Sequence, residues 1–214
     1  MVSIPKFHYK TTENTRIAIC VPVRDVVTAK FSYSLAMLTK KCGEMSQKVT
    51  LHYNMGSEVT MQRQQLVEEA LQTNCTHILW LDSDMTFPTH TLQALLSHDK
   101  DIIACNYSTR VPPHRPVAFK SENDLDARIS NGTGIQKIFA VGMGCMLVKR
   151  KVYEEMKKPF FSITWNDNYT NLVGEDIYFC TKAKEHGYEV WLDNDLSNSI
   201  THIGTRSFTI KGDC

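Results

Sequence analysis

The segment Ile78-Leu79-Trp80-Leu81-Asp82-Ser83-Asp84 carries the clearest structural signal in this chain. Four large apolar residues lead directly into two carboxylates separated by one residue. A short apolar run that ends in charge is typical of a buried central strand reaching the edge of its sheet. Ligands of open α/β sheets bind just beyond such carboxyl ends, and paired aspartates suit a divalent cation with phosphate ligands. An ordinary Asx-type turn has the same pattern, so both interpretations stay open.

The residues around this segment alternate between strand and helix patterns. We expect strands at 16–23, 49–53, 78–81 and 101–105, helices at 28–41 and 59–73, and a short helix opened by Pro88. Gly43 is the expected stop of the first helix. The order βαβαβαβ favours a doubly wound, mostly parallel sheet.

The pattern changes after Asn106. A loop rich in Pro and Arg is expected first, and the regular elements follow it. Strands are expected at 117–120, 135–141, 145–148, 160–165 and 188–192, and helices at 150–157 and 174–186. We therefore expect one domain over 1–214, with one half at about 16–105 and a second at about 106–204.

Composition restricts the possible partners. The formal net charge is +1, with 42% hydrophobic and 22% charged residues, so bulk electrostatics gives no reason to expect a nucleic-acid partner. No apolar run has the length of a membrane span, and residues 1–10 lack a signal-peptide core, so we expect a cytoplasmic protein. Seven cysteines without Cys-x-x-Cys spacing are interpreted as reduced core residues rather than disulfides or a zinc site.

Arg63 shares a helix face with Leu66 and Val67, although that face is apolar. An arginine on the buried side of a helix needs a partner. Two partners are open: a ligand at the carboxyl edge of the sheet, or a salt bridge to a carboxylate such as Asp25.

Polar residues stand at the edges of three elements: Asp82 with Asp84, Glu175-Asp176, and His202. Carboxylates and an imidazole suit Mn²⁺ or Mg²⁺, with positions left for diphosphate oxygens and water. A carboxylate at 175 or 176 is a candidate general base. Ordinary explanations exist as well, because acidic residues are favoured in a first helical turn and a single histidine is usually structural.

The motifs in order resemble the GT-A-fold glycosyltransferases, in particular inverting, family-two-like enzymes related to processive synthases and their small phage- and large-DNA-virus-encoded members. The resemblance rests on Val21-Pro22-Val23-Arg24, on Leu79–Asp84, on Gly174–Cys180 with Ala183 and Gly187, on Val141–Arg150, and on His202-Ile203-Gly204. It covers about 16–204. It implies an α/β, Rossmann-like GT-A fold: a mostly parallel central sheet with helices on both faces and a smaller antiparallel acceptor-side portion.

The resemblance also implies roles for individual residues. Asp84 would bind the metal, His202 would be a further metal contact, and Asp82 would reach the metal or the ribose. Asp176 would be the catalytic base. The nucleotide-sugar site would comprise Pro22, Val23, Arg24, Asn54, Arg63, Asp82 and Ser83, and the acceptor site Gly144, Trp165 and Glu175. Asn54 departs from the family pattern, because many relatives carry an aspartate after the second strand to recognise uracil.

The implied activity is a metal-dependent, hexosyltransferase-type transfer. A sugar would move with inversion from a nucleoside diphosphate sugar, expected to be UDP-linked, to a hydroxyl of a glycan or glycoprotein acceptor. If the chain is virus-encoded, it would act in the host-cell cytoplasm. One alternative is a sugar-phosphate nucleotidyltransferase, although residues 23–27 lack the glycines usual in its phosphate loop. Another is a non-catalytic domain that binds sugars or nucleotides.

Overall fold

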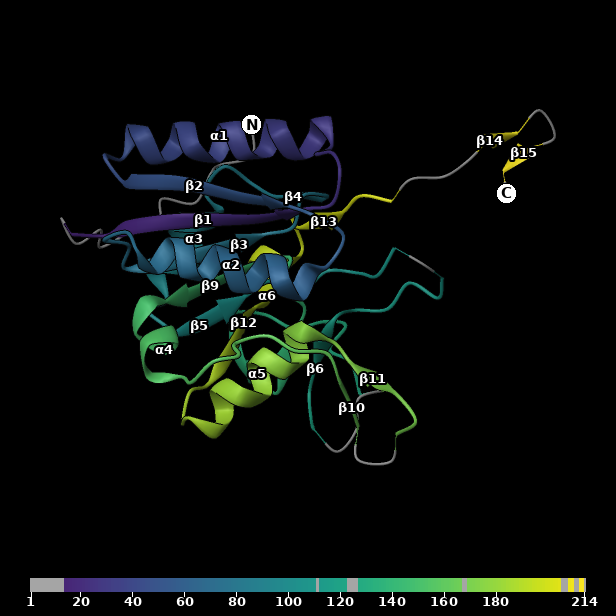
Figure 1. Ribbon diagram of the computed structural model, residues 1–214. Helices are drawn as coiled ribbons and strands as arrows, with labels where there is room; N and C mark the ends of the chain where they lie inside the picture. The colour runs from purple at the N-terminus through teal and green to yellow at the C-terminus, as the bar shows by residue number, and fades with distance from the viewer. Residues whose placement is uncertain are drawn as a thin grey trace.

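The computed structural model describes residues 14–110, 112–122, 127–166 and 169–204, with the backbone of 208–209 and 212–213. A seven-stranded sheet with the order β2-β1-β3-β9-β5-β12-β7 forms the centre of these residues, and four two-stranded sheets accompany it (Figure 1). The architecture is a mixed α/β fold, as the alternating hydrophobic pattern predicts.

The first half alternates strands and helices in the expected order. Its elements are β1 (Arg16–Val23), α1 (Ala29–Glu44), β2 (Lys48–Met55), α2 (Val59–Leu71), β3 (His77–Leu81), β4 (Met85–Thr86), α3 (Thr91–Ser97) and β5 (Ile102–Ala104). Gly43 does not stop α1 as expected. The helix continues to Glu44 and ends before Ser46, whose φ of 55° is incompatible with a right-handed helix.

The second half contains shorter elements. They are β6 (Ala118–Phe119), β7 (Ile135–Ile138), β8 (Ala140–Val141), β9 (Cys145–Lys149), α4 (Arg150–Glu155), β10 (Thr164–Trp165), β11 (Leu172–Val173), α5 (Glu175–Glu185), β12 (Val190–Asp193), α6 (Asn194–Ser197), β13 (Thr201–His202), β14 (Phe208–Thr209) and β15 (Gly212–Asp213). The expected strand at 160–165 is reduced to the two residues of β10, because Phe160 and Phe161 are buried core residues that precede the strand.

Strand β9 has a position that the sequence pattern does not predict. It lies between β3 and β5 and runs antiparallel to both, whereas β1 is parallel to β2 and β3, and β12 is parallel to β5. The sheet is thus mostly parallel, with β9 and β7 reversed. Because β9 is antiparallel to β3, its start meets the end of β3: Leu81 is paired with Cys145, and the Asp82 N–H donates to the Gly144 carbonyl at 3.1 Å.

Helices cover both faces of the sheet, as expected. One core contains residues of α2, α4 and α5, and the other contains residues of α1, α3 and α6 (Figure 1). Trp80 and Leu81 are buried on opposite faces, so β3 is a central strand with both sides covered. All six described cysteines are buried and unpaired, in agreement with their interpretation as core residues. No helix among the described residues is long and apolar enough to cross a membrane.

Candidate active site at the carboxyl edge of the sheet

Asp84 and His202 meet at the end of β3. They are brought together by the small antiparallel sheet of β4 and β13, in which His202 is paired with Met85. The Asp84 carbonyl also accepts the Ile203 N–H at 2.8 Å. His202 Nε2 lies 3.3 Å from Asp84 Oδ1. We call Asp84 and His202 the outer pair.

The histidine of the outer pair is oriented by the loop at 106–116. His202 Nδ1 lies 3.0 Å from the Ser108 carbonyl, which can only accept, so Nδ1 carries the hydrogen. Burial alone would lower the pKa of His202, but the hydrogen bonds to Asp84 and Ser108 raise it. Burial alone would raise the pKa of Asp84, but the hydrogen bond and charge of His202 lower it, and Arg110 adds to this.

The outer pair has the donors that a divalent metal needs. An Nδ1–H held by a carbonyl is the arrangement of a metal-ligating histidine, because it turns Nε2 toward Asp84, where a bound metal would replace their present contact. Asp84 supplies the carboxylate that Mn²⁺ or Mg²⁺ prefers. Among the described residues no group of three His, Cys, Asp or Glu side chains is placed to hold a metal. The protein therefore offers two converging ligands, and a phosphate-bearing ligand and water would have to complete the shell.

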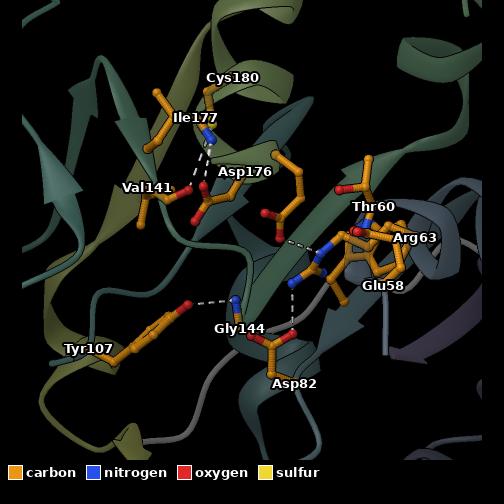
Figure 2. A network of polar contacts seen from close by, with 12 residues as sticks. Glu58, Thr60, Arg63, Asp82, Tyr107, Val141, Gly144, Asp176, Ile177 and Cys180 are labelled. Carbon is orange, nitrogen blue, oxygen red and sulfur yellow. Dashed lines mark hydrogen bonds and ion pairs between the residues drawn. The ribbon is translucent and has the colours of Figure 1, made fainter. Parts of the chain in front are cut away.

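Arg63 links α2, β3 and α5 in a second cluster. Its Nη2 is 2.8 Å from Asp82 Oδ1, and its Nε is 3.2 Å from Glu175 Oε1 (Figure 2). The side chain is only 3% exposed and lies over the Trp80 ring at 5.5 Å. Burial disfavours the charge, but Asp82 and Glu175 raise the pKa of Arg63, so it stays ionised. We call Arg63, Asp82 and Glu175 the buried bridge.

The buried bridge shows which protein partners Arg63 has, and its contact with a ligand stays a prediction. The arginine is paired with carboxylates, but with Asp82 and Glu175 rather than with Asp25, which lies beside exposed Arg24 at 3.6 Å. Its Nη1 is buried and has no hydrogen-bond partner among the described residues. Asp82 Oδ1 is thus held by an arginine of α2.

Asp176 lies in the first turn of α5, next to Glu175. Its Oδ1 accepts its neighbour Ile177's N–H at 2.8 Å (Figure 2). A Cβ at Gly174 would lie 2.8 Å from the same oxygen, so a glycine is needed there. Burial, with the charge of Glu175 adding to it, raises the pKa of Asp176 to about 6. This carboxyl group titrates close to neutrality, as general bases often do.

Tyr107 lies between the two clusters. Its hydroxyl accepts the Gly144 N–H at 3.0 Å (Figure 2). Its ring meets the His202 ring edge to face at 5.3 Å. A Cβ at Gly144 would approach the Tyr107 ring to 2.8 Å, and a Cβ at Gly142 would also collide with it. Sequence reasoning placed Tyr107 in a loop and missed it. The close spacing of the two glycines was the available signal, because it indicated a close approach.

The expected base-binding residues lie at the end of β1 and β2. Pro22 is paired with Asn54, so these residues share the carboxyl edge with Asp82. Gln62, which the sequence pattern did not single out, donates to both the Val23 and the Asn54 carbonyls at 2.6 Å. Arg24 is exposed. Ser83 is half-buried beside Asp82.

The expected acceptor-side residues fall into two groups. Glu175 is in the buried bridge, and Gly144 lies beside Asp82. Trp165 is exposed on the hairpin of β10 and β11, which leads directly into α5. The structure thus brings Asp82, Asp84, His202, Glu175 and Asp176 to one edge.

Comparisons with known proteins agree with this architecture. The family model Anp1, a glycosyltransferase family, matches residues 47–128, which include the Asp82–Asp84 motif. A search of curated proteins gave no match.

Three solved structures share the fold. A197 from STIV superimposes with a TM-score of 0.54 at 15% identity, covering 83% of this chain and 81% of that one. A Drosophila β-1,4-galactosyltransferase 7 mutant in complex with manganese, UDP-Gal and xylobiose superimposes with a TM-score of 0.53 at 14% identity. The match covers 89% of this chain and 71% of that one. The inositol-1-phosphate CTP transferase from T. maritima superimposes with a TM-score of 0.51 at 15% identity, and the match covers 90% of each chain. The fold is therefore GT-A-like, the fold that the sequence motifs predict.

Proposed function

We propose that the protein is a metal-dependent glycosyltransferase. It moves a sugar with inversion from a nucleoside diphosphate sugar, with a UDP-sugar as the first candidate, to a hydroxyl of a glycan or glycoprotein. The observation that carries the proposal is the meeting of the outer pair and the buried bridge, with Asp176 beside it, at the carboxyl edge of a GT-A-like sheet. The Anp1 match and the galactosyltransferase fold support it.

The outer pair would hold Mn²⁺ or Mg²⁺ together with the donor's diphosphate. When bound, the metal would neutralise the negative charge that develops on the leaving diphosphate. Asp82 would contact the donor ribose or the metal. The buried bridge fixes this carboxylate, because Arg63 holds Oδ1 and the second oxygen remains available.

Asp176 would be the general base. At pH 7 a carboxyl group with a pKa of about 6 is mostly ionised and can accept a proton. It takes the proton of the acceptor hydroxyl while that oxygen forms a bond to the anomeric carbon. The bond from this carbon to the diphosphate breaks on the opposite face, and the diphosphate leaves with the electron pair. A single displacement of this kind inverts the configuration.

The donor base would bind where β1 and β2 end. Pro22, Val23, Arg24 and Asn54 are the proposed contacts. An apolar groove of about 500 Å³ opens beside them between α1 and β2, with Val23, Val26 and Met55 among its lining residues. Such a surface suits one face of a nucleobase.

The acceptor would bind between the hairpin of β10 and β11 and the end of β3. The exposed rings of Trp165 and Tyr169 can stack on sugar faces, and Gly144 lies beside Asp82 at the end of β3. Glu175 borders this region through its contact with Arg63.

The direct test is a panel of nucleoside diphosphate sugars, with release of the nucleoside diphosphate measured with and without Mn²⁺ or Mg²⁺. We expect metal-dependent release from one donor. Asp176→Asn should reduce turnover by about 10²-fold or more while donor affinity stays unchanged. The matched control is Glu185→Gln, an exposed carboxylate on the same helix, which should keep full activity. Full activity of Asp176→Asn would place the base elsewhere.

One alternative has specific support. The inositol-1-phosphate CTP transferase shares the fold, so a nucleotidyltransferase activity is the second candidate. It predicts pyrophosphate release from a nucleoside triphosphate and a sugar 1-phosphate. Metal-dependent nucleotide binding without either reaction would favour a binding domain instead.

A further inference from the structure

Residues 106–110 and 112–116 form a turn that reaches back to the outer pair. Ser108 and Pro116 form an antiparallel bridge at its base. The Thr109 N–H donates to the Arg115 carbonyl at 2.9 Å, and the Arg115 N–H donates to Thr109 Oγ1 at 3.0 Å. The turn is thus held by contacts of Ser108, Thr109, Arg115 and Pro116, and none of these contacts involves the side chain of Arg110.

Arg110 extends from this turn to the carboxylate proposed as a metal ligand. Its Nη1 lies 2.7 Å from Asp84 Oδ2, while Asp84 Oδ1 faces His202. The Arg110 side chain is 52% exposed, so it can rotate into solvent or toward a ligand. The two oxygens of Asp84 thus face different partners, the Arg110 guanidinium and the His202 ring.

A divalent cation on Asp84 Oδ1 and this guanidinium on Oδ2 would repel each other across the shared carboxylate. Their repulsion at a few ångströms is several times the thermal energy at a protein surface. A diphosphate would remove the conflict, because its oxygens bind the metal on one side and accept hydrogen bonds on the other. Arginine is well suited to donate those hydrogen bonds, because its planar fork of donors matches phosphate oxygens.

We propose that Arg110 is an exchange residue that couples metal binding to nucleotide binding. Without donor it neutralises Asp84 and opposes the metal. When metal and nucleoside diphosphate bind together, Arg110 moves from Asp84 to the diphosphate. This inference rests on the proposed function, because it takes the outer pair to be the metal site.

The test measures binding rather than turnover. Mn²⁺ affinity is measured by electron paramagnetic resonance without nucleotide and with saturating UDP, and UDP affinity by calorimetry with and without Mn²⁺. GDP and CDP serve as parallel probes. Arg110→Gln should tighten Mn²⁺ binding without nucleotide and weaken UDP binding with Mn²⁺, each by about fivefold or more, within the usual range of coupling between sites. The ratio of Mn²⁺ affinities with and without UDP falls accordingly.

Two further variants separate this role from a general disturbance of the loop. Arg110→Lys keeps the charge and should retain most of the coupling. Arg115→Gln removes one exposed arginine from the same turn and should leave all four constants within about twofold of the original protein. Thermal unfolding checks that each variant is folded.

Distinct results overturn distinct claims. If the unsubstituted protein couples Mn²⁺ and nucleotide binding and Arg110→Gln leaves this coupling unchanged, Arg110 is an ordinary surface ion pair and the inference is wrong. If Arg110→Gln weakens the binding of Mn²⁺ and of UDP equally, the exchange of Arg110 between Asp84 and the diphosphate is also wrong. If Asp84→Asn leaves Mn²⁺ binding intact, or if no probe shows metal-dependent binding, the proposed metal site itself is wrong.

Discussion

The two polar clusters at the carboxyl edge of the sheet differ in the burial of the arginine that each contacts and in how they hold charge. The buried bridge places one arginine, 3% exposed, between two carboxylates. The outer pair shares its carboxylate with Arg110, which is 52% exposed. Buried ion pairs are strongly destabilising when one partner is removed, whereas exposed pairs contribute little. The buried bridge is therefore a fixed support that joins α2, β3 and α5, and the outer pair is a place where partners can be exchanged.

Breaking the buried bridge should have the largest effect. Arg63→Met leaves Asp82 and Glu175 without their cation, so the free energy of unfolding should fall by about 3–5 kcal/mol. Urea unfolding followed by circular dichroism measures this change. Arg24→Met, which removes an exposed arginine, should change it by less than about 0.5 kcal/mol. Equal stability of the two variants would show that the buried bridge is not a support.

Breaking the outer pair should affect binding rather than stability. Asp84→Asn should weaken metal-dependent nucleotide binding by more than about 100-fold. Substituting a residue that only hydrogen-bonds to a metal ligand already lowers metal affinity by about 10–100-fold. The free energy of unfolding should change by less than about 1 kcal/mol, since Asp84 pairs with an exposed arginine. Calorimetry and urea unfolding on the same samples test both parts. A large loss of stability with unchanged binding would reverse the roles of the two clusters.

The contact between the clusters can be loosened at Gly144. A Cβ there would lie 2.8 Å from the Tyr107 ring, so Gly144→Ala must displace the ring that contacts His202. We expect a loss of about 1–3 kcal/mol in the free energy of unfolding, as for other overpacked sites. Gly43→Ala is the matched control. Nothing lies within 4 Å of its added methyl group, and it is inside α1, so this variant should be stabilised by roughly 0.5–1 kcal/mol.

The last comparison concerns pH. Asp176 has a pKa of about 6 in the folded protein and about 3.8 when unfolded, so the folded state binds this proton more tightly. Its favourable contribution to stability is complete below the unfolded pKa and is lost as the pH rises through about 6. The unfolding free energy of the original protein should thus fall between about pH 4 and 6 relative to that of Asp176→Asn. Parallel curves for the two proteins would show that the Asp176 pKa is not raised.

Much of the candidate site is predictable from local sequence. Asp82 and Asp84 follow a central strand, and Asp176 starts a helix, so each side chain lies where its motif indicates. His202 was predicted through resemblance as a metal contact, and the structure places its Nε2 3.3 Å from Asp84 Oδ1. Roles in catalysis and binding stay predictions until the experiments above are done.

Other parts of the site depend on long-range contacts that local patterns do not contain. The sequence indicated that Arg63 needs a partner, but its second carboxylate, Glu175, lies 112 residues further along the chain. Tyr107 and Arg110 are in a Pro- and Arg-rich loop without periodicity, so nothing local indicated that they reach Gly144 and Asp84. The helical pattern around Gln62 likewise gave no indication that its side chain reaches the Val23 carbonyl.

The sequence alone determined the alternation of strands and helices, the central position of β3 and the carboxylates at its end, because hydrophobic periodicity and turn residues act over a few neighbours. Only the tertiary structure decided that β9 returns between β3 and β5 and brings Gly144 beside Asp82. It also decided which charges meet in the buried bridge and in the outer pair. Such pairings depend on how distant segments pack, and burial then determines which of them are fixed and which can exchange.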